Sequence, residues 1–303
     1  MSSLLSTLKS YVDLTRIQFF FVWPLLFCSG LFLSFSTYGG FSWSLVIKAA
    51  LIALLGFEAG FVLNDYVDRD HDKKDVEPDL TNYWRLFNSR PLTTGIITSK
   101  NALILFFLLV TVTSALILTL PYPNSLYVLG IMAYSYLAEY YYQTKKRNQN
   151  APIAQLIGRT DFSLFPVAGY LVNGQPDIVA LSYFLFFYPF AQAHLGANDI
   201  IDTVNDKVRG LMTIPILYGT KSTTTWIHFF TLLHIFGAFN FIGNMVSQVA
   251  VYGIILGCII LIAGNIFINR ASSSLQWLKA LPTFHVAMLI YTTSMIAGYF
   301  YQY

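Results

Sequence analysis

Two short acidic segments predict metal-dependent chemistry. Segment 64–72 reads NDYVDRDHD, and segment 198–206, which reads NDIIDTVND, repeats its pattern of Asn-Asp-x-x-Asp-x-x-x-Asp. On a helix, this spacing of i, i+3 and i+7 places all three carboxylates on one face. Mg²⁺ prefers oxygen ligands and is typically bound by one or two carboxylates together with substrate phosphates. The two segments therefore predict divalent cations held against a substrate that carries phosphate.

The many acidic residues in and around these motifs also predict that positive charge lies between them. Segment 65–79 contains seven acidic residues and segment 198–206 contains three. Facing each other in a partly dehydrated site, these groups would repel strongly. Magnesium ions between them, bound to a diphosphate, would stabilise a departing pyrophosphate and so ionise an allylic C–O bond. A single acidic run would be typical of solvated surface, but its repetition with identical spacing favours function.

The composition is that of a membrane protein, with 55% hydrophobic and 11% charged residues, against about 25% charged in a soluble domain. A helix needs roughly 20 apolar residues to cross a bilayer. The long apolar stretches have natural breaks at 121–124 (PYPN) and 243–244 (GN). We expect nine spans, near 17–36, 43–63, 102–120, 125–142, 152–172, 179–197, 224–242, 247–268 and 280–301.

The basic residues predict the orientation of these spans, because Lys and Arg collect in cytoplasmic loops. Lys48 and Arg159 lie inside spans, and the other sixteen of the 18 basic residues fall in segments on one side. We therefore expect the amino terminus and the acidic motifs on the cytoplasmic side, and the carboxyl terminus outside. Leu4, Leu5 and Leu8 have helical spacing, which predicts a short helix on the cytoplasmic interface.

The motifs also predict how the chain is organised. They end spans two and six, so four spans separate them and both must emerge on the same side. We expect an all-α membrane protein with a single domain over 1–303, built from two four-helix pseudo-repeats plus one helix. Segments 64–100 and 198–223 would form cytoplasmic cap loops, and such repeats usually place the functional site at their interface. The net charge of +3 is spread over loops, which argues against a nucleic-acid partner.

The motifs resemble those of a known family. Segment 64–72, followed by 89–95 (SRPLTTG), resembles the first signature of the UbiA superfamily of intramembrane prenyltransferases, NDxxDxxxD followed by RPLxxG. Asp202 to Asp206, followed by Gly210 and the T-x-P of 213–215, is similar to the second signature. The resemblance implies nine helices around a central cavity that is capped by the polar loops. It also implies magnesium-dependent transfer of an isoprenoid chain from a prenyl diphosphate to a lipophilic acceptor, with release of pyrophosphate.

The resemblance further implies which residues bind two magnesium ions. By position, these residues are Asn64, Asp68 and Asp72 for one ion, and Asp202 and Asp206 for the other. The four aspartates of this set would be the catalytic residues. Asp65 and Asp199 would support the metal ligands.

Several cationic side chains are expected to bind the diphosphate. Arg69 and Arg90 fall where the family places phosphate-binding cations, a role that suits the planar guanidinium. Arg16 could reach the diphosphate or serve as a membrane anchor. Many family members have Tyr followed four residues later by Lys after span four. Tyr141 and Lys145 restore that spacing, although an aromatic belt with a basic anchor explains them equally.

Three polar residues inside spans have both a functional and a structural interpretation. Ionisable groups within a membrane are costly and usually have a partner. A structural pair between Glu58 and Arg159 is favoured over a catalytic role for either. His194 lies one helical turn before Asn198 and either faces the cavity or is hydrogen-bonded in the core.

Two other function classes remain open at this stage. A secondary transporter would also have repeats and intramembrane charges, but its acids belong near the bilayer midplane rather than at span ends. A phosphatidyl-group transferase would also use aspartates and magnesium, but its D-G-x-x-A-R opening is missing here. The acceptor also stays open between an aromatic quinone precursor and a prenylglycerol phosphate. The prenyl donor ranges from geranyl to geranylgeranyl diphosphate or longer.

Overall fold

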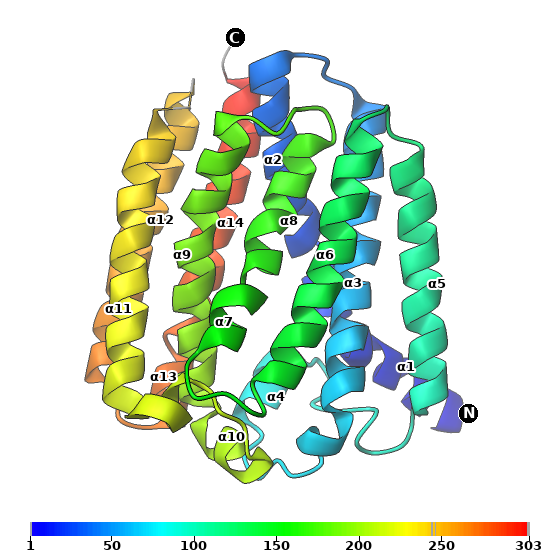
Figure 1. The fold of residues 1–303 in the computed structure, drawn as a ribbon, viewed down its shortest axis with the longest axis vertical. Helices are drawn as coiled ribbons and strands as arrows, with labels where there is room; N and C mark the ends of the chain where they lie inside the picture. The colour runs from blue at the N-terminus through cyan, green and yellow to red at the C-terminus, as the bar shows by residue number, and fades with distance from the viewer. Residues whose placement is uncertain (1, 244, 246, 302–303) are drawn as a thin grey trace.

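The computed structural model describes residues 2–243, 245 and 247–301, with side chains from Leu4 onward. Within these ranges the chain forms helices joined by turns and loops, and the long helices stand side by side (Figure 1). The longer helices are α2 (Val22–Tyr38), α3 (Trp43–Asp72), α5 (Ser99–Leu118), α6 (Asn124–Lys145), α8 (Thr160–Leu171), α9 (Ile178–Ile201), α11 (Ile214–Ile242), α12 (Gln248–Arg270) and α14 (Leu281–Phe300). The shorter ones are α1 (Ser2–Thr15), η1 (Ile17–Phe19), α4 (Asp79–Trp84), α7 (Ile153–Gly158), α10 (Thr203–Arg209) and α13 (Ser274–Leu278).

The long apolar helices identify a multi-pass integral membrane protein. In the described part of the chain, 7 helical segments are long and apolar enough to cross a membrane. They contain α2, α3, α5, α9, α11, α12 and α14. Helix α6 is less apolar than these, and the α7–α8 column is interrupted at Arg159. Each expected span nevertheless coincides with a helix or, for 152–172, with the α7–α8 pair.

The two acidic motifs differ in backbone structure. Helix α3 continues through Asp72, so the first motif is helical throughout, and Asp65, Asp68 and Asp72 are buried together along one face as predicted. In the second motif the expectation of one continuous helix is wrong. Helix α9 ends at Ile201 and α10 begins at Thr203, because Asp202 has φ −89° and ψ 10°.

Short helices gather at the end of the bundle that carries the motifs. Figure 1 shows α4, α10 and α13 at this lower end, with the carboxyl terminus at the opposite end. The segments that follow α3 and α9 therefore reach the same end of the molecule. This arrangement brings together two motifs that lie far apart in the sequence.

Glycines allow two helices of the bundle to pack in direct backbone contact. A Cβ atom on Gly30 of α2 would lie 1.9 Å from the carbonyl oxygen of Pro166 in α8, and one on Gly169 of α8 would lie 1.8 Å from that of Phe27 in α2. Small residues at membrane helix interfaces permit such close approach. The α2–α8 contact thus fixes α8, which forms part of the cavity wall described below.

Candidate active site

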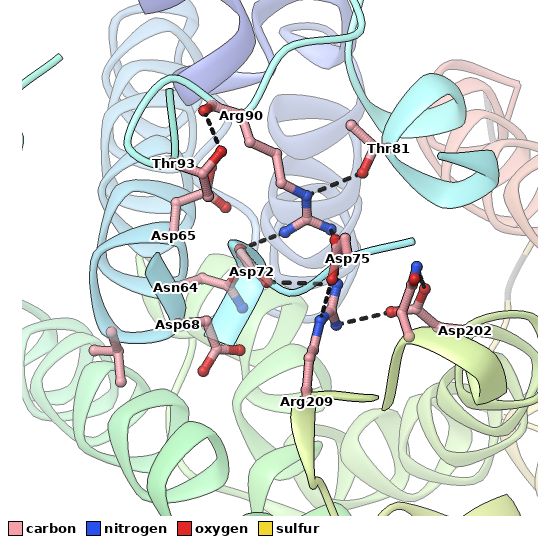
Figure 2. A network of polar contacts seen from close by, with 12 residues as sticks. Asn64, Asp65, Asp68, Asp72, Asp75, Thr81, Arg90, Thr93, Asp202 and Arg209 are labelled. Carbon is pink, nitrogen blue, oxygen red and sulfur yellow. Dashed lines mark hydrogen bonds and ion pairs between the residues drawn. The ribbon is translucent and has the colours of Figure 1, made fainter. Parts of the chain in front are cut away.

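The two acidic motifs meet through arginine side chains. Arg209 Nη1 lies 2.9 Å from Oδ2 of Asp202 in the second motif, and its Nη2 lies 3.5 Å from Oδ1 of Asp72 in the first. Arg90 forms an ion pair with Asp72, and its Nη2 lies 3.0 Å from Oδ2 of Asp75. Figure 2 shows these residues converging from helix ends and from the loops on either side of α4. The tertiary structure therefore assembles both motifs into a single site.

The motifs line a pocket of about 160 Å³, which we term the polar pocket. Its acidic lining residues are Asp68, Asp72, Asp199, Asp202 and Asp206, and its basic lining residues are Arg16, Arg85, Arg90, Lys146, Arg159 and Arg209. Carboxylates can bind metal cations, and guanidinium and ammonium groups can bind phosphate oxygens. The polar pocket is therefore suited to an anionic group that binds together with divalent cations.

Ion pairs compensate the buried carboxylates of the first motif. Asp68 lies 2.6 Å from Lys146 Nζ and 3.1 Å from Arg147 Nη2. Asp65 lies 2.7 Å from Arg85 and 2.9 Å from Arg16. Buried charges are costly unless they are paired in this way. Asp65 therefore holds two of the cations that line the polar pocket.

One carboxyl of the second motif is less well compensated. Burial, together with the nearby charges of Asp202 and Asp199, raises the pKa of Asp206 well above its ordinary value. A hydrogen bond of 2.7 Å from Thr213 Oγ1 to Asp206 Oδ2 opposes this rise. An added cation would favour the ionised form of Asp206, because opposite charge stabilises a carboxylate.

The polar pocket adjoins a larger apolar cavity. This cavity has a volume of about 250 Å³ and shares Arg16, Asn64, Trp84, Arg159 and Asn198 with the polar pocket. Aromatic side chains form much of its wall, namely Trp23, Phe57, Phe61, Phe162 and Phe165. A charged compartment next to an apolar one matches an amphiphile with an anionic headgroup and a hydrocarbon tail.

Most of the residues predicted from the sequence lie at the polar pocket. The predicted residues that line it are Asn64, Asp68, Asp72, Asp199, Asp202, Asp206, Arg16 and Arg90. Arg69 differs from its expected position. Its guanidinium lies over the ring of Tyr66, 4.5 Å from the centroid, and 3.6 Å from Asp70. It is turned away because it follows Asp68 by one residue, which rotates it about 100° around the helix.

The tyrosine and lysine that line the polar pocket near the end of α6 each lie one residue later in the sequence than expected. Tyr142 and Lys146 line the polar pocket, and among the described lining residues Tyr141 and Lys145 are not found. The Lys146 ammonium lies 5.0 Å from the centroid of the Tyr142 ring. Helix α6 ends at Lys145, so Lys146 is the first residue beyond it and turns toward Asp68. The spacing of four between Tyr and Lys is kept, but the register moves by one position.

The expected pair between Glu58 and Arg159 is wrong. Both carboxylate oxygens of Glu58 are buried without a hydrogen-bond partner among the described residues. The guanidinium of Arg159 instead lies over the ring of Tyr142, 5.2 Å from its centroid, and lines both the polar pocket and the apolar cavity. Arg159 is therefore part of the site rather than a helix-bridging ion pair.

Sequence reasoning missed Arg85 and Arg209 as site residues. Arg85 is 3% exposed and binds Asp65 through both carboxylate oxygens. Arg209 follows Asp206 by three residues, and Gly210, which has φ +75°, ends the helix directly after it. A basic residue one turn beyond an acidic motif is the signal that could have identified Arg209. No comparable spacing singled out Arg85, because its position depends on the fold of the loop that contains α4.

Comparison with known proteins gives consistent matches. The UbiA prenyltransferase family model matches residues 21–292. The chain is 29% identical over 278 residues to a 4-hydroxybenzoate octaprenyltransferase of Shewanella denitrificans, covering 88% of this chain and 86% of that one. It is 29% identical over 229 residues to a digeranylgeranylglyceryl phosphate synthase of Methanobrevibacter smithii, covering 71% of this chain and 76% of that one. A UbiA homologue of Archaeoglobus fulgidus, solved with DMAPP and Mg²⁺, shares the fold with a TM-score of 0.66 at 16% identity, covering 95% of this chain and 99% of that one.

Proposed function

Because the chain belongs to the UbiA prenyltransferase family, we propose that it is a magnesium-dependent intramembrane enzyme that moves an isoprenoid chain from a prenyl diphosphate to a lipophilic acceptor and releases pyrophosphate. Family membership confirms the resemblance drawn from the motifs. It also favours prenyl transfer over the transporter and phosphatidyl-group transferase alternatives. The observation that carries the proposal is that the polar pocket, where both motifs meet, shares five lining residues with the apolar cavity.

The proposal includes a complete topology. Helix α6 and the α7–α8 column are proposed as two further spans, which with the seven apolar segments makes nine. We retain a single domain over 1–303, two four-helix pseudo-repeats plus one helix, a cytoplasmic amino terminus and an external carboxyl terminus. Leu4, Leu5 and Leu8 support the interfacial placement of α1, because their side chains are 76%, 55% and 61% exposed. The polar pocket would then open toward the cytoplasm.

The side chains of the polar pocket fit magnesium. The carboxylates of Asp68, Asp72, Asp202 and Asp206 line one small pocket, and burial together with the neighbouring aspartate charges raises the pKa of Asp206. Asn64, Asp68 and Asp72 would hold one ion, and Asp202 and Asp206 the other. When bound, magnesium neutralises charge on a departing pyrophosphate. Asp65 and Asp199 would act as supports, the former through Arg16 and Arg85.

Cations of this chain would bind the diphosphate. Arg90, Arg209 and Lys146 line the polar pocket close to the aspartates, and Arg16 lies at its junction with the apolar cavity. Their positive charge stabilises the negative charge that develops on pyrophosphate as the C–O bond breaks. Arg69, Tyr141 and Lys145, which were expected here, are not part of this proposed set, because they lie away from the pocket.

The apolar cavity would hold the prenyl tail and protect the reactive carbon. Rings such as Phe57, Phe61 and Phe162 present π-systems that attract positive charge. Trp23 and Phe57 stack with centroids 3.6 Å apart, which makes this part of the wall firm. Exclusion of water from such a cavity prevents an allylic cation from being hydrolysed before the acceptor attacks.

The acceptor is proposed to be an aromatic quinone precursor or a prenylglycerol phosphate. The named relatives act in these two kinds of synthesis, as a 4-hydroxybenzoate octaprenyltransferase and a digeranylgeranylglyceryl phosphate synthase. Both kinds of acceptor are anionic. Arg159 lines the polar pocket and the apolar cavity, so it is placed to attract either one.

The proposal is tested with membranes that contain the protein. They are incubated with labelled geranyl or geranylgeranyl diphosphate and with either 4-hydroxybenzoate or geranylgeranylglyceryl phosphate, with and without Mg²⁺. Prenylated product is identified by mass, and pyrophosphate is measured in parallel. We expect magnesium-dependent release of pyrophosphate and one prenylated product. Absence of both in correctly inserted protein would contradict the proposal.

Matched aspartate variants test the metal assignment within the same assay. Asp68→Asn and Asp202→Asn should reduce turnover by at least about 10³-fold, because each removes charge from a metal ligand and from its ion pairs. Asp70→Asn is the control, since Asp70 belongs to the same motif but its side chain is 62% exposed and pairs with Lys73. Wild-type turnover in the first two variants would rule out the assignment.

A further inference from the structure

A chain of three hydrogen-bonded side chains leads away from the apolar cavity. His194 lines the cavity, and its Nε2 lies 3.0 Å from Nε2 of His285. The other ring nitrogen of His285, Nδ1, lies 2.7 Å from the hydroxyl oxygen of Tyr83. The Tyr83 side chain is partly exposed. The three residues thus connect the wall of the cavity with the surface at the motif end of the bundle.

The three groups come from separate elements and are held in place by aromatic packing. His194 lies on α9, His285 on α14 and Tyr83 on α4. The ring of His194 is parallel to that of Phe190 within 3°. Trp84, which lines both the polar pocket and the cavity, packs edge-on against His285 with centroids 5.0 Å apart. His194, the first of the three hydrogen-bonded groups, therefore lies close to the boundary between the polar pocket and the apolar cavity, where the reacting carbon would sit.

The proposed reaction needs such a route, because it produces a proton inside an apolar compartment. The allylic C–O bond breaks, and its electron pair leaves with pyrophosphate. The acceptor forms the new bond to carbon with its own electron pair. Its O–H or ring C–H bond then breaks, and that electron pair returns to the acceptor. A base in the cavity must remove this proton before product can leave as a neutral or singly charged species.

We propose that His194, His285 and Tyr83 form a proton relay that carries the acceptor's proton from the apolar cavity to the surface, an inference that rests on the function proposed above. Nδ1 of His194 takes the proton from the acceptor, and Nε2–H of His194 passes one to Nε2 of His285. Nδ1–H of His285 then passes one to the Tyr83 oxygen, and the Tyr83 hydroxyl releases one to water. Each group gains one proton and loses one, so no net charge is left on the relay, and the two imidazole rings end as the opposite tautomers.

Two acidic groups in the cavity wall are the alternatives to His194 as base. Asp161 and Glu139 both line the cavity. Glu139 already accepts a hydrogen bond of 2.7 Å from Asn64, and Asp161 accepts one from the backbone of Phe162. These contacts, and a further one from the Gln143 amide to Glu139, come from amide or peptide N–H groups, which do not take up and pass on a proton as imidazole and phenol groups can. His194 is therefore preferred as the first member.

A buried histidine elsewhere shows what a purely structural role looks like. His234 Nδ1 lies 2.8 Å from the Phe186 carbonyl oxygen, and its Nε2 lies 2.9 Å from the Tyr291 hydroxyl. It is completely buried and is not among the described residues that line the polar pocket or the apolar cavity. His234→Gln is thus a matched control, because it also breaks a histidine–tyrosine contact between helices.

The experiment measures how the allylic cation is partitioned. The full-length protein in lipid vesicles receives labelled geranylgeranyl diphosphate, Mg²⁺ and either 4-hydroxybenzoate or geranylgeranylglyceryl phosphate. Pyrophosphate, prenylated acceptor and prenyl alcohol are quantified together. In His194→Gln we expect transfer to the acceptor to fall by about 10²-fold or more, while pyrophosphate release persists and prenyl alcohol accumulates. Tyr83→Phe and His285→Gln should shift the ratio in the same direction, and His234→Gln should keep the wild-type ratio.

Added imidazole provides a readout that a structural role would not move. In His194→Ala, imidazole should restore part of the transfer by replacing the missing base. An unchanged ratio in folded His194→Gln, an equal loss of pyrophosphate and product in the relay variants, or a shift in Asp161→Asn alone would overturn the relay. Absence of transfer to both acceptors in the wild type would instead contradict the proposed function, and the relay with it.

Discussion

Arg209 Nη2 lies 3.5 Å from Asp72 Oδ1, so a cation that follows the second acidic motif contacts the last aspartate of the first. The same guanidinium also lies 2.9 Å from Asp202. One side chain therefore joins two motifs that come from different parts of the sequence. Its charge also reduces the repulsion between carboxylates that would otherwise face one another.

The first prediction concerns this arginine. Arg209→Gln should lower the free energy of unfolding by about 3 kcal/mol without magnesium, because it leaves buried aspartates uncompensated. Added Mg²⁺ should recover part of the loss by supplying positive charge to the same carboxylates. Thermal unfolding in detergent, in EDTA and in Mg²⁺, measures both effects.

Lys207→Gln is the control for this prediction, since Lys207 is exposed on the same short helix. It should unfold like the wild type in both conditions. Equal stability of Arg209→Gln and Lys207→Gln in EDTA would show that the bridge between the motifs contributes nothing.

The second prediction separates the two possible registers at the end of α6. Lys146→Met should lower kcat/KM for the prenyl diphosphate by about 10²-fold, because Lys146 contacts Asp68 at 2.6 Å inside the polar pocket. Lys145→Met should change it less than about threefold, given that the lysine lies outside that pocket. Steady-state kinetics of pyrophosphate release compares the two. A larger loss of kcat/KM in Lys145→Met than in Lys146→Met would support the register expected from the sequence.

The third prediction concerns pH and magnesium. Burial and the charges of Asp202 and Asp199 raise the pKa of Asp206, whereas a magnesium ligand must be ionised. As the pH falls through this raised pKa, the Mg²⁺ concentration for half-maximal activity should increase by up to about tenfold per pH unit. Without metal, the free energy of unfolding should increase as the pH falls, because Asp206 binds the proton more tightly in the folded protein than in the unfolded chain.

Thr213→Val tests the assignment of this pH dependence to Asp206. The variant removes the hydroxyl that donates to Asp206 Oδ2 at 2.7 Å, and a carboxylate that loses a donor has a higher pKa. The magnesium profile should therefore move to higher pH. A profile identical to that of the wild type would point to another titrating group.

The fourth prediction concerns the contact between α2 and α8. Gly169→Val should destabilise the protein by about 3 kcal/mol or more, because its Cβ would lie 1.8 Å from the backbone oxygen of Phe27, which cannot move aside. Gly130→Val is the matched change, since a Cβ there meets no atom within 4 Å. Unfolding temperature and yield of inserted protein measure the difference. Tolerance of valine at 169 would show that the two helices can separate.

Local sequence patterns predicted the helices and the first motif well. Hydropathy located the long helices because each needs a long apolar stretch that faces lipid or other helices. The spacing of Asp65, Asp68 and Asp72 matched one face of a helix. The same reasoning failed at Asp202, where the chain leaves the helix, and at Lys145, where the helix ends. Both failures occur at helix ends, where backbone direction depends on tertiary contacts rather than on periodicity.

The sequence by itself determined a membrane protein with duplicated acidic motifs at one end of its helices, because apolar length and residue spacing are properties of the chain alone. The tertiary structure decided which cations neutralise those acids. Arg85, Arg90, Lys146 and Arg209 reach the carboxylates from different segments, and no spacing along the chain encodes such distances. The alignment of His194, His285 and Tyr83 depends in the same way on the packing of three helices.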